Sequence, residues 1–273
     1  MAKRLAVIGC GNMGAAIVRG LLKEKWTTAS HLMASHPHRA ALLTKELGIR
    51  VVASNRKAAE DASVILLAVK PQILPEVLEE LAGYVDAGAL VLSMAAGVGT
   101  QRIEEALPGI AVVRSMPNLA ATVGMGATAI APGAHADFEH IHLARSVFEA
   151  VGTVEEVPER LMDAVTGLSG TGPMYVFHLV EAMADAGVKV GLSRDVASRL
   201  ASQTVLGSAR LAQQSDLHPA ALKDQVTSPA GTASRPRTPA PRPARSCCVP
   251  DAPQKAGRPP GRHNWRWMTR GTL

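Results

Sequence analysis

Cysteine and aromatic residues are scarce in this 273-residue sequence, which has 3 cysteines and 3% Phe, Trp and Tyr. Two of the cysteines, Cys247 and Cys248, are adjacent, and no Cys-x-x-C pair occurs, so the sequence predicts neither a disulfide framework nor a zinc site. Long apolar runs are missing too: the longest, residues 64–69, is far shorter than the roughly 18 residues that span a bilayer. With no signal peptide or anchor in the sequence, we expect a cytoplasmic protein.

The positive charge is concentrated near the C-terminal end. Residues 233–273 hold nine of the 29 Lys and Arg residues, one of the 23 Asp and Glu residues and eight of the 18 prolines. Residues 1–232 are therefore mildly acidic, so the net charge of +6 gives no reason to expect a basic face on the folded part. Because the last segment also lacks hydrophobic periodicity, we predict a disordered tail over 233–273.

The first half of the chain alternates between short apolar runs and helical patterns. The expected strands are 3–9, 31–34, 50–53, 63–69, 90–94 and 111–115, and the expected helices are 13–22, 39–47, 73–84 and 100–107. This order is typical of a doubly wound parallel sheet in an α/β fold. Beyond residue 158 the pattern is helical without intervening strands, at 159–165, 173–188 and 194–213.

A glycine-rich loop follows the first predicted strand and opens the first helix. It reads Gly-Cys-Gly-Asn-Met-Gly, which fits G-x-G-x-x-G. Gly9 permits the tight turn, Gly11 lets the backbone approach a pyrophosphate, and Gly14 lets helix and strand pack closely. The free N–H groups of the helix start then face the phosphates. We therefore predict a dinucleotide-binding Rossmann domain over residues 1–157 and an all-helical domain over 158–232.

The cofactor preference depends on residues about 20 positions beyond the loop, where an NAD-preferring site offers Asp or Glu to the ribose 2′-hydroxyl. This chain has Ala-Ser-His-Pro-His-Arg at 34–39 and no acid there. Ser35 can donate a hydrogen bond and Arg39 can pair with a 2′-phosphate, so the sequence favours NADP(H), with NAD(H) as the alternative. The other interpretation of Arg39 is that it only begins a solvated helix.

Six ordered motifs lie between about residues 3 and 232. They are the glycine loop, Ala-Val-Lys-Pro-Gln at 68–72, Ser-Met-Ala-Ala-Gly at 93–97, Arg-Ser-Met-Pro-Asn at 114–118, Asp-Ala-Val-Thr-Gly-Leu-Ser-Gly-Thr-Gly-Pro at 163–173 and Leu-Lys-Asp-Gln-Val-Thr-Ser-Pro at 222–229. Together they resemble the Δ1-pyrroline-5-carboxylate reductase family. The resemblance implies NAD(P)H-dependent reduction of a cyclic imine to L-proline, the last step of proline biosynthesis. It also implies a homodimer or larger homo-oligomer that interlocks through the helical dimerisation domain.

The resemblance further assigns cofactor contacts. Ser35 and Asn55 are expected near the adenosine, residues 68–71 along the cofactor and residues 95–97 near the nicotinamide ribose. The physical reason is that the ligand crevice of an open α/β sheet lies at the carboxyl ends of its strands. The other expected contacts are Ile8, Gly9, Gly11, Asn12, Met13, Gly14, Arg39, Ala68, Val69, Lys70, Pro71, Ala95, Ala96, Gly97 and Asn118.

Substrate contacts are expected in the helical part, where backbone N–H groups at a helix start suit the substrate carboxylate. They are Glu159, Gln225, Ser228, Gly231, Thr232 and Ala233, with Thr232 as the candidate for a catalytic role. Glu159 has an alternative interpretation as an acid that stabilises the start of its own helix.

Other functions are tested on the same residues. A β-hydroxyacid dehydrogenase is expected to carry G-x-G-x-x-x-K-x-x-x-N at the start of its second domain, and here Val176 and Val180 take the places of the lysine and the asparagine. The histidines at 135, 140 and 142 have no spacing that converges on a metal, so no metal is expected.

The sequence departs from the family pattern near residue 230. The family usually reads Ser-Pro-Gly-Gly-x-Thr followed by apolar helices, whereas here Ser-Pro-Ala-Gly-Thr-Ala ends at Ala233 and passes into the basic tail. Our hypothesis is that residues from about 233 are read out of frame. The competing interpretation of this segment is a genuine tail that binds nucleic acid through its arginines, with Trp265 and Trp267 stacking on bases, and we consider it weaker. For the function, the alternative to a working reductase is a catalytically impaired, NADP-binding remnant of the enzyme.

Overall fold

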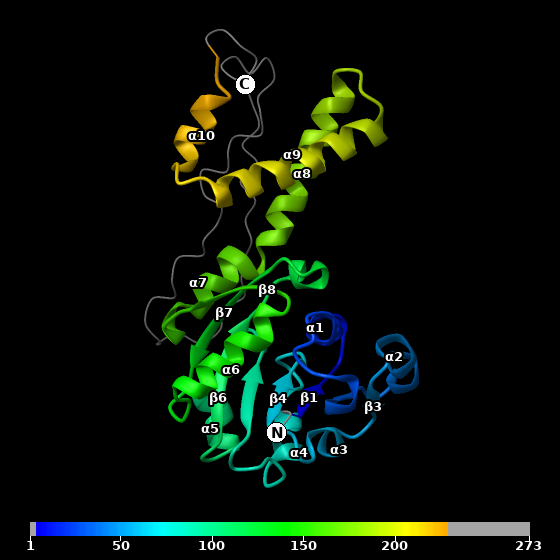
Figure 1. Ribbon diagram of the computed structural model, residues 1–273, viewed down its shortest axis with the longest axis vertical. Helices are drawn as coiled ribbons and strands as arrows, with labels where there is room; N and C mark the ends of the chain where they lie inside the picture. Colours follow the sequence, from blue (N-terminus) through cyan, green and yellow to red (C-terminus); the bar gives the residue numbers. More distant parts are fainter. Residues whose placement is uncertain (1–3, 229–273) are drawn as a thin grey trace, which may run out of the picture.

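Short apolar strands form one mixed sheet within residues 4–228, the part of the chain that this computed structural model describes (Figure 1). The strands are β1 (Leu5–Ile8), β2 (Leu32–Ser35), β3 (Arg50–Val52), β4 (Val64–Leu67), β5 (Leu90–Ser93), β6 (Ala111–Met116), β7 (Gly126–Pro132) and β8 (Gly152–Glu156). Their order in the sheet is β3-β2-β1-β4-β5-β6-β7-β8, and all neighbours are parallel except β6 and β7. β1, β4 and β5 are buried at every position, as expected of parallel strands covered on both faces.

The strand order reverses at β1, which pairs with β2 on one side and β4 on the other. Ile8 at the end of β1 is level with Ser35 of β2 and Leu67 of β4. This is the topological switch point, where the crevice of an open α/β sheet opens at the carboxyl ends of the strands. The predicted α/β Rossmann fold is confirmed.

Helices cover both faces of the sheet and bury alternate residues of its strands. They are α1 (Asn12–Lys23), α2 (Ala40–Leu47), α3 (Asn55–Ala59), α4 (Leu74–Leu81), α5 (Thr100–Ala106) and α6 (Phe138–Glu149). Leu5 and Val7 of β1 pack in the core cluster with α1, α2 and α6, whereas Ala6 and Ile8 pack in the cluster with α3, α4 and α5. The period of two along a strand thus produces two hydrophobic layers.

The region between residues 116 and 157 contains elements that the sequence patterns do not predict. β7 reads Gly-Ala-Thr-Ala-Ile-Ala-Pro, a run of mostly small residues, and β8 buries only Val154 at its centre. α6 follows β7 and begins with a capping box in which Asp137 and His140 exchange hydrogen bonds with each other's backbone. The short 3-10 turns η1 (Ala29–His31) and η2 (Leu119–Val123) are also unpredicted.

The prediction of a single α-helix at 159–165 is wrong, because the segment consists of three different helical turns. The segment is a 3-10 turn, η3 (Glu159–Leu161), one α-helical turn, α7 (Met162–Val165), and a π-helical turn, η4 (Thr166–Gly170). Gly170 lies so close to β6 that a Cβ there would be 2.6 Å from Met116 Cε. Gly167 and Gly170 have low helix propensity, and Gly170 contacts the sheet. Both features favour the wider π-helical turn over a regular α-helix.

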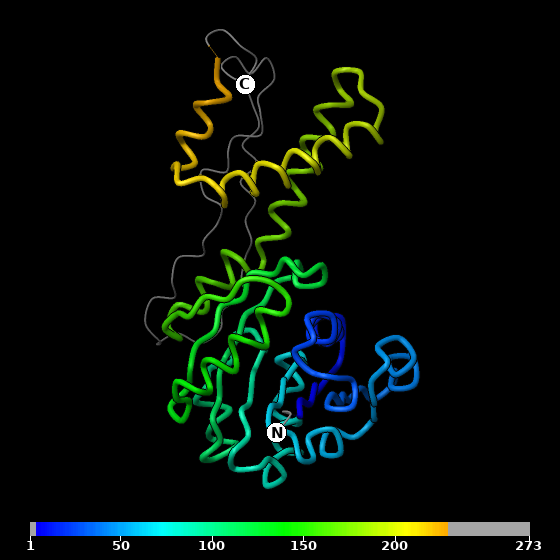
Figure 2. The backbone as a smooth tube through the Cα atoms, viewed as in Figure 1, coloured from blue at the N-terminus to red at the C-terminus, as the bar shows by residue number. Residues whose placement is uncertain are grey.

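The remaining described helices, α8 (Gly172–Lys189), α9 (Arg194–Gln214) and α10 (Pro219–Gln225), extend away from the sheet. Figure 2 shows the chain leave the sheet along α8, reverse and return along α9. Ala184, Ala197 and Ala201 are buried between these two helices, so small side chains permit their close packing. Several large apolar side chains of α8 and α9 are exposed in a single copy: Met174, Val176, Phe177, Leu179, Leu200, Leu206 and Leu211.

We expect Gly152→Ala to lower the free energy of unfolding by roughly 1–3 kcal/mol, as overpacking usually does. Gly152 has φ of +152°, and a Cβ there would overlap the backbone of Gly126 on β7. Gly88→Ala is the matched control, because nothing lies within 4 Å of its Cβ position. Urea unfolding followed by circular dichroism measures both variants, and equal midpoints would contradict the tight pairing of β7 with β8.

Candidate functional site

Two glycines allow the turn between β1 and α1 to pack directly on the end of β4. Gly9 has φ of +80°, and a Cβ on it would overlap the side chain of Val69 and lie 3.2 Å from the Val69 nitrogen. A Cβ on Gly14 would lie 3.0 Å from Val7 Cγ1 and 3.4 Å from Ala68 Cβ. A larger residue at either position would push the loop away from the strand ends, so the glycines create the floor of the crevice.

The start of α1 offers backbone N–H groups to an anion at the carboxyl edge of the sheet. Gly11 is the N-cap residue and supplies no side-chain cap, and the first turn contains no acid. The first bond of the helix runs from the Ala15 nitrogen to the Gly11 oxygen at 2.9 Å, so Asn12, Met13 and Gly14 precede the regular ladder. A helix of 12 residues with an open, uncharged first turn suits a pyrophosphate.

Ser35 and Asn55 form a partly buried chain of hydrogen bonds behind the loop. Ser35 Oγ accepts from the Gly9 nitrogen (3.2 Å) and donates to Asn55 Oδ1 (2.6 Å), while Asn55 Nδ2 donates to Glu80 Oε2 (2.7 Å). The Cys10 nitrogen also donates to the Ser35 carbonyl (2.8 Å). Ser35 is fully buried, and its hydroxyl proton points to Asn55. In this arrangement the Ser35 hydroxyl holds the glycine loop, a role that the sequence analysis does not predict.

Arg39 lies at the N-cap position of α2, exposed beyond the end of β2. The turn before it is held by His36, whose Nδ1 accepts from the backbone nitrogens of His38 (3.3 Å) and Arg39 (3.2 Å). Burial, followed by the nearby Arg39 and His38, lowers the pKa of His36 below its usual range, which keeps the ring neutral and able to accept both bonds. Because His36 holds only the backbone of Arg39, the exposed side chain of Arg39 extends into solvent.

The loops after β4 and β5 line the same edge. Ala68 donates its N–H to the Ile8 carbonyl (2.8 Å), and the loop continues through Val69 and Pro71, with Lys70 exposed. After β5, Ala95 is buried and donates its N–H to Ser93 Oγ (3.3 Å), whereas Ala96 and Gly97 are exposed.

Asn118, expected at the cofactor, ties three segments together. Its Oδ1 accepts from the nitrogens of Ala120 (3.2 Å) and Ala127 (3.3 Å), and its Nδ2 donates to the Ser169 carbonyl (3.1 Å). The side chain thus connects the end of β6 with β7 and with the π-helical turn η4.

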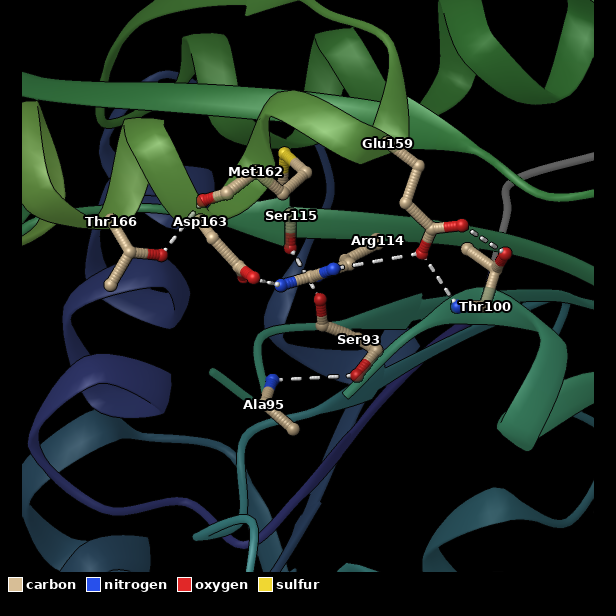
Figure 3. A network of polar contacts seen from close by, with 9 residues as sticks. All are labelled: Ser93, Ala95, Thr100, Arg114, Ser115, Glu159, Met162, Asp163 and Thr166. Carbon is tan, nitrogen blue, oxygen red and sulfur yellow. Dashed lines mark hydrogen bonds and ion pairs between the residues drawn. The ribbon is translucent and has the colours of Figure 1, made fainter. Parts of the chain in front are cut away.

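A charge network around the buried Arg114 joins the sheet to the first turns of the helical part (Figure 3). Arg114 of β6 has a side chain that is 8% exposed, and its Nη2 lies 3.2 Å from Asp163 Oδ1 and its Nη1 3.7 Å from Glu159 Oε1. Glu159 also accepts from the nitrogen (2.7 Å) and the hydroxyl (2.9 Å) of Thr100 at the start of α5. Glu159 therefore caps α5 rather than its own turn. Arg114, Asp163 and Thr100 are not predicted as functional residues, although an arginine within the apolar run 111–115 is a signal for one.

Among the predicted substrate residues that the structure describes, Glu159 contacts Thr100 next to the loop after β5, whereas Gln225 and Ser228 lie elsewhere. Gln225 ends α10 and Ser228 follows it, both exposed, and Figure 1 shows α10 well away from the carboxyl ends of β1 and β4. Gly231, Thr232 and Ala233 lie outside the described residues, as does the predicted tail over 233–273.

Cys10 is buried under the glycine loop, and this burial raises the pKa of its thiol to about 11. The thiol stays protonated near neutral pH, so Cys10 acts as a small packing residue. Within residues 4–228, the structure contains no group of three or more His, Cys, Asp or Glu side chains that could hold a metal ion. The helices of the same range include none with the length and hydropathy that a membrane span requires.

Comparison with known proteins gives consistent matches over most of the chain. The family described as "Pyrroline-5-carboxylate reductase dimerisation" matches residues 159–235, and "NADP oxidoreductase coenzyme F420-dependent" matches residues 4–97. A pyrroline-5-carboxylate reductase from Synechocystis sp. is 48% identical over 234 residues, which cover 85% of this chain and 87% of the relative.

Two solved structures share the fold. A pyrroline-5-carboxylate reductase from Coxiella burnetii superposes with a TM-score of 0.80 and 34% identity over 86% of this chain and 88% of the other. A Plasmodium falciparum pyrroline carboxylate reductase with NADP bound gives a TM-score of 0.77 and 30% identity over 85% and 87%. The identity to the Synechocystis enzyme, over most of both chains, establishes that this chain belongs to the pyrroline-5-carboxylate reductase family.

Proposed function

We propose that this chain uses NAD(P)H to reduce the C=N bond of 1-pyrroline-5-carboxylate to L-proline, the last step of proline biosynthesis. The observation that carries the proposal is the open start of α1, packed against the end of β4, in a chain that belongs to this reductase family. The product requires a hydride at the imine carbon and a proton at the ring nitrogen.

The residues present fit a dinucleotide. Gly9 and Gly14 let the loop lie close against Val69 and Val7, and the uncapped first turn of α1 presents N–H groups to the pyrophosphate. When bound, the cofactor supplies the hydride, and the protein's own part is to hold and orient the two reactants. The expected lining is the loop Ala68–Pro71 near the cofactor and Ala95–Gly97 near the nicotinamide ribose.

NADP(H) is the proposed preferred cofactor. Arg39 is the exposed cation beyond β2, and the segment 34–39 contains no acid that would repel a 2′-phosphate. Ser35 supports the site by holding the Gly9 nitrogen and Asn55. Asn55 contributes in turn by keeping Ser35 in place.

The working unit is proposed to be a homodimer or larger homo-oligomer in the cytoplasm. Exposed apolar side chains on α8 and α9, among them Phe177 at 60%, provide a surface that a second copy can cover. Gln225 and Ser228 lie away from the crevice of their own chain, so we propose that they serve the crevice of the second copy, together with Gly231, Thr232 and Ala233. Out-of-frame reading from about 233 remains our hypothesis for the departure from the family pattern.

We predict that Arg39→Ala weakens the binding of NADPH about tenfold and leaves the binding of NADH unchanged, because only NADPH carries the 2′-phosphate that a charge-assisted pair would hold. Lys45→Ala, which removes an exposed cation from α2, is the control and leaves both affinities unchanged. Titration followed by the fluorescence of the bound dihydronicotinamide measures the dissociation constants. An equal loss of affinity for NADPH and NADH would show that Arg39 does not bind the 2′-phosphate.

The activity is tested by following NADPH oxidation with 1-pyrroline-5-carboxylate and, in a separate assay, NADP+ reduction with 3-hydroxyisobutyrate. We expect turnover of the imine and none of the hydroxy acid, since Val176 takes the place of the lysine that hydroxyl chemistry needs.

A second protein, in which the residues after Thr232 are replaced by a family-like C-terminus, is assayed in parallel. Activity in this second protein alone would identify the chain as an impaired, cofactor-binding form, and turnover of the hydroxy acid would refute the proposal.

A further inference from the structure

Arg114 occupies a place in the sheet where a charge needs partners. It belongs to β6 and is level with Ser93, the last residue of β5, and with Ala131 of β7. Its side chain is 8% exposed, so an unpaired guanidinium there would be strongly destabilising. The partners are two acids one helical turn apart, Glu159 and Asp163, which both come from the segment that follows the last strand.

Glu159 makes two kinds of contact at once. Its Oε1 atom lies 3.7 Å from Arg114 Nη1 and accepts a hydrogen bond from the Thr100 nitrogen at 2.7 Å. Its Oε2 atom accepts a hydrogen bond from the Thr100 hydroxyl at 2.9 Å. Thr100 is 4% exposed and begins α5, directly after the loop that contains Ala95, Ala96 and Gly97. The same carboxylate therefore holds both the arginine of the sheet and the end of this loop (Figure 3).

A second set of contacts fixes the other end of the same segment. Asn118, just beyond β6, donates to the carbonyl of Ser169 in η4, and Gly170 packs on Met116. The segment 159–170 is thus attached to β6 at both ends, and α8 continues from it. A shift of Thr100, the residue that follows the loop before α5, would lengthen its two hydrogen bonds to Glu159.

We infer that Glu159, held by Arg114, is a positioning residue that fixes the loop Ala95–Gly99 against the base of the helical part. The inference rests on the proposed function, in which that loop lines the nicotinamide end and the helical part supplies the substrate contacts. Glu159 then sets the distance across which the hydride moves. A displacement of about 1 Å at reacting atoms costs on the order of 100-fold in rate, so a small shift of this loop is sufficient to matter.

The test is Glu159→Gln in the full chain. The amide keeps one acceptor for Thr100 but removes the charge that faces Arg114. We expect kcat to fall at least about tenfold, and the isotope effect with NADPH deuterated at the transferred position to rise, because the hydride step becomes slower. The dissociation constant of NADPH changes less than about threefold, since the start of α1 is untouched. Glu155→Gln, which removes an exposed acid of β8, changes none of these quantities.

Hydrogen exchange supplies a readout that needs neither cofactor nor substrate. We expect the Thr100 amide to exchange about tenfold faster in Glu159→Gln than in Glu155→Gln, because its acceptor is weakened. If Glu159→Gln does not fold, Thr100→Val tests the same contact, since it removes one donor without leaving Arg114 unpaired.

The possible outcomes separate the two proposals. If the full chain reduces no imine, the proposed function fails, while exchange at Thr100 still tests the hold of Glu159 on the loop. The inference is overturned if, in an active chain, both Glu159→Gln and Thr100→Val leave kcat and the isotope effect unchanged and Glu159→Gln also leaves the exchange of the Thr100 amide unchanged. A loss confined to the affinity for NADPH also overturns it.

Discussion

The close crossing of the glycine loop over the end of β4 is the constraint on which the rest of the structure depends. A Cβ at Gly9 would overlap Val69, and one at Gly14 would crowd Val7, so the two glycines let the turn lie close against the strand ends. The crossing occurs at the switch point of the sheet, where α1 packs on one face and α4 on the other and the start of α1 carries no side-chain cap. Ser35 and Asn55 brace it from behind with side-chain hydrogen bonds. Anion binding then needs no cationic side chain in the loop, because the helix start already carries partial positive charge.

A second constraint comes from a buried charge. The side chain of Arg114 is 8% exposed and its guanidinium lies 3.2 Å from Asp163 and 3.7 Å from Glu159, and both acids belong to the first turns after the last strand. The need to neutralise the arginine therefore fixes where the helical part begins relative to the sheet. Because Glu159 also caps α5 through Thr100, the position of the helical part and the position of the loop after β5 are not independent. The structure thus connects the two regions that must cooperate in the proposed reaction.

The parts of the fold that could be predicted are those whose signal is local. β1, β4 and β5 are apolar runs because both faces are buried, and the G-x-G-x-x-G spacing marks the turn that follows β1. β7 and β8 were not predicted, because β7 consists mostly of small residues and β8 ends in two glutamates, so neither shows a clear apolar run. Ser35 resembles a ligand contact in sequence, but its burial and its bond to Asn55 depend on β2, α3 and the loop meeting in space. For the same reason, the partners of Arg114, distant in sequence, could not be read from the motif that contains it.

The central claim is that this chain delivers a hydride to a cyclic imine, and isotope transfer tests it most directly. The 273-residue chain would be incubated with 1-pyrroline-5-carboxylate and NADPH that carries deuterium at the transferred position, and the product would be analysed by mass spectrometry and NMR. The account predicts L-proline with a single deuterium at the former imine carbon. Proline without the label, or oxidation of NADPH without formation of proline, would contradict it.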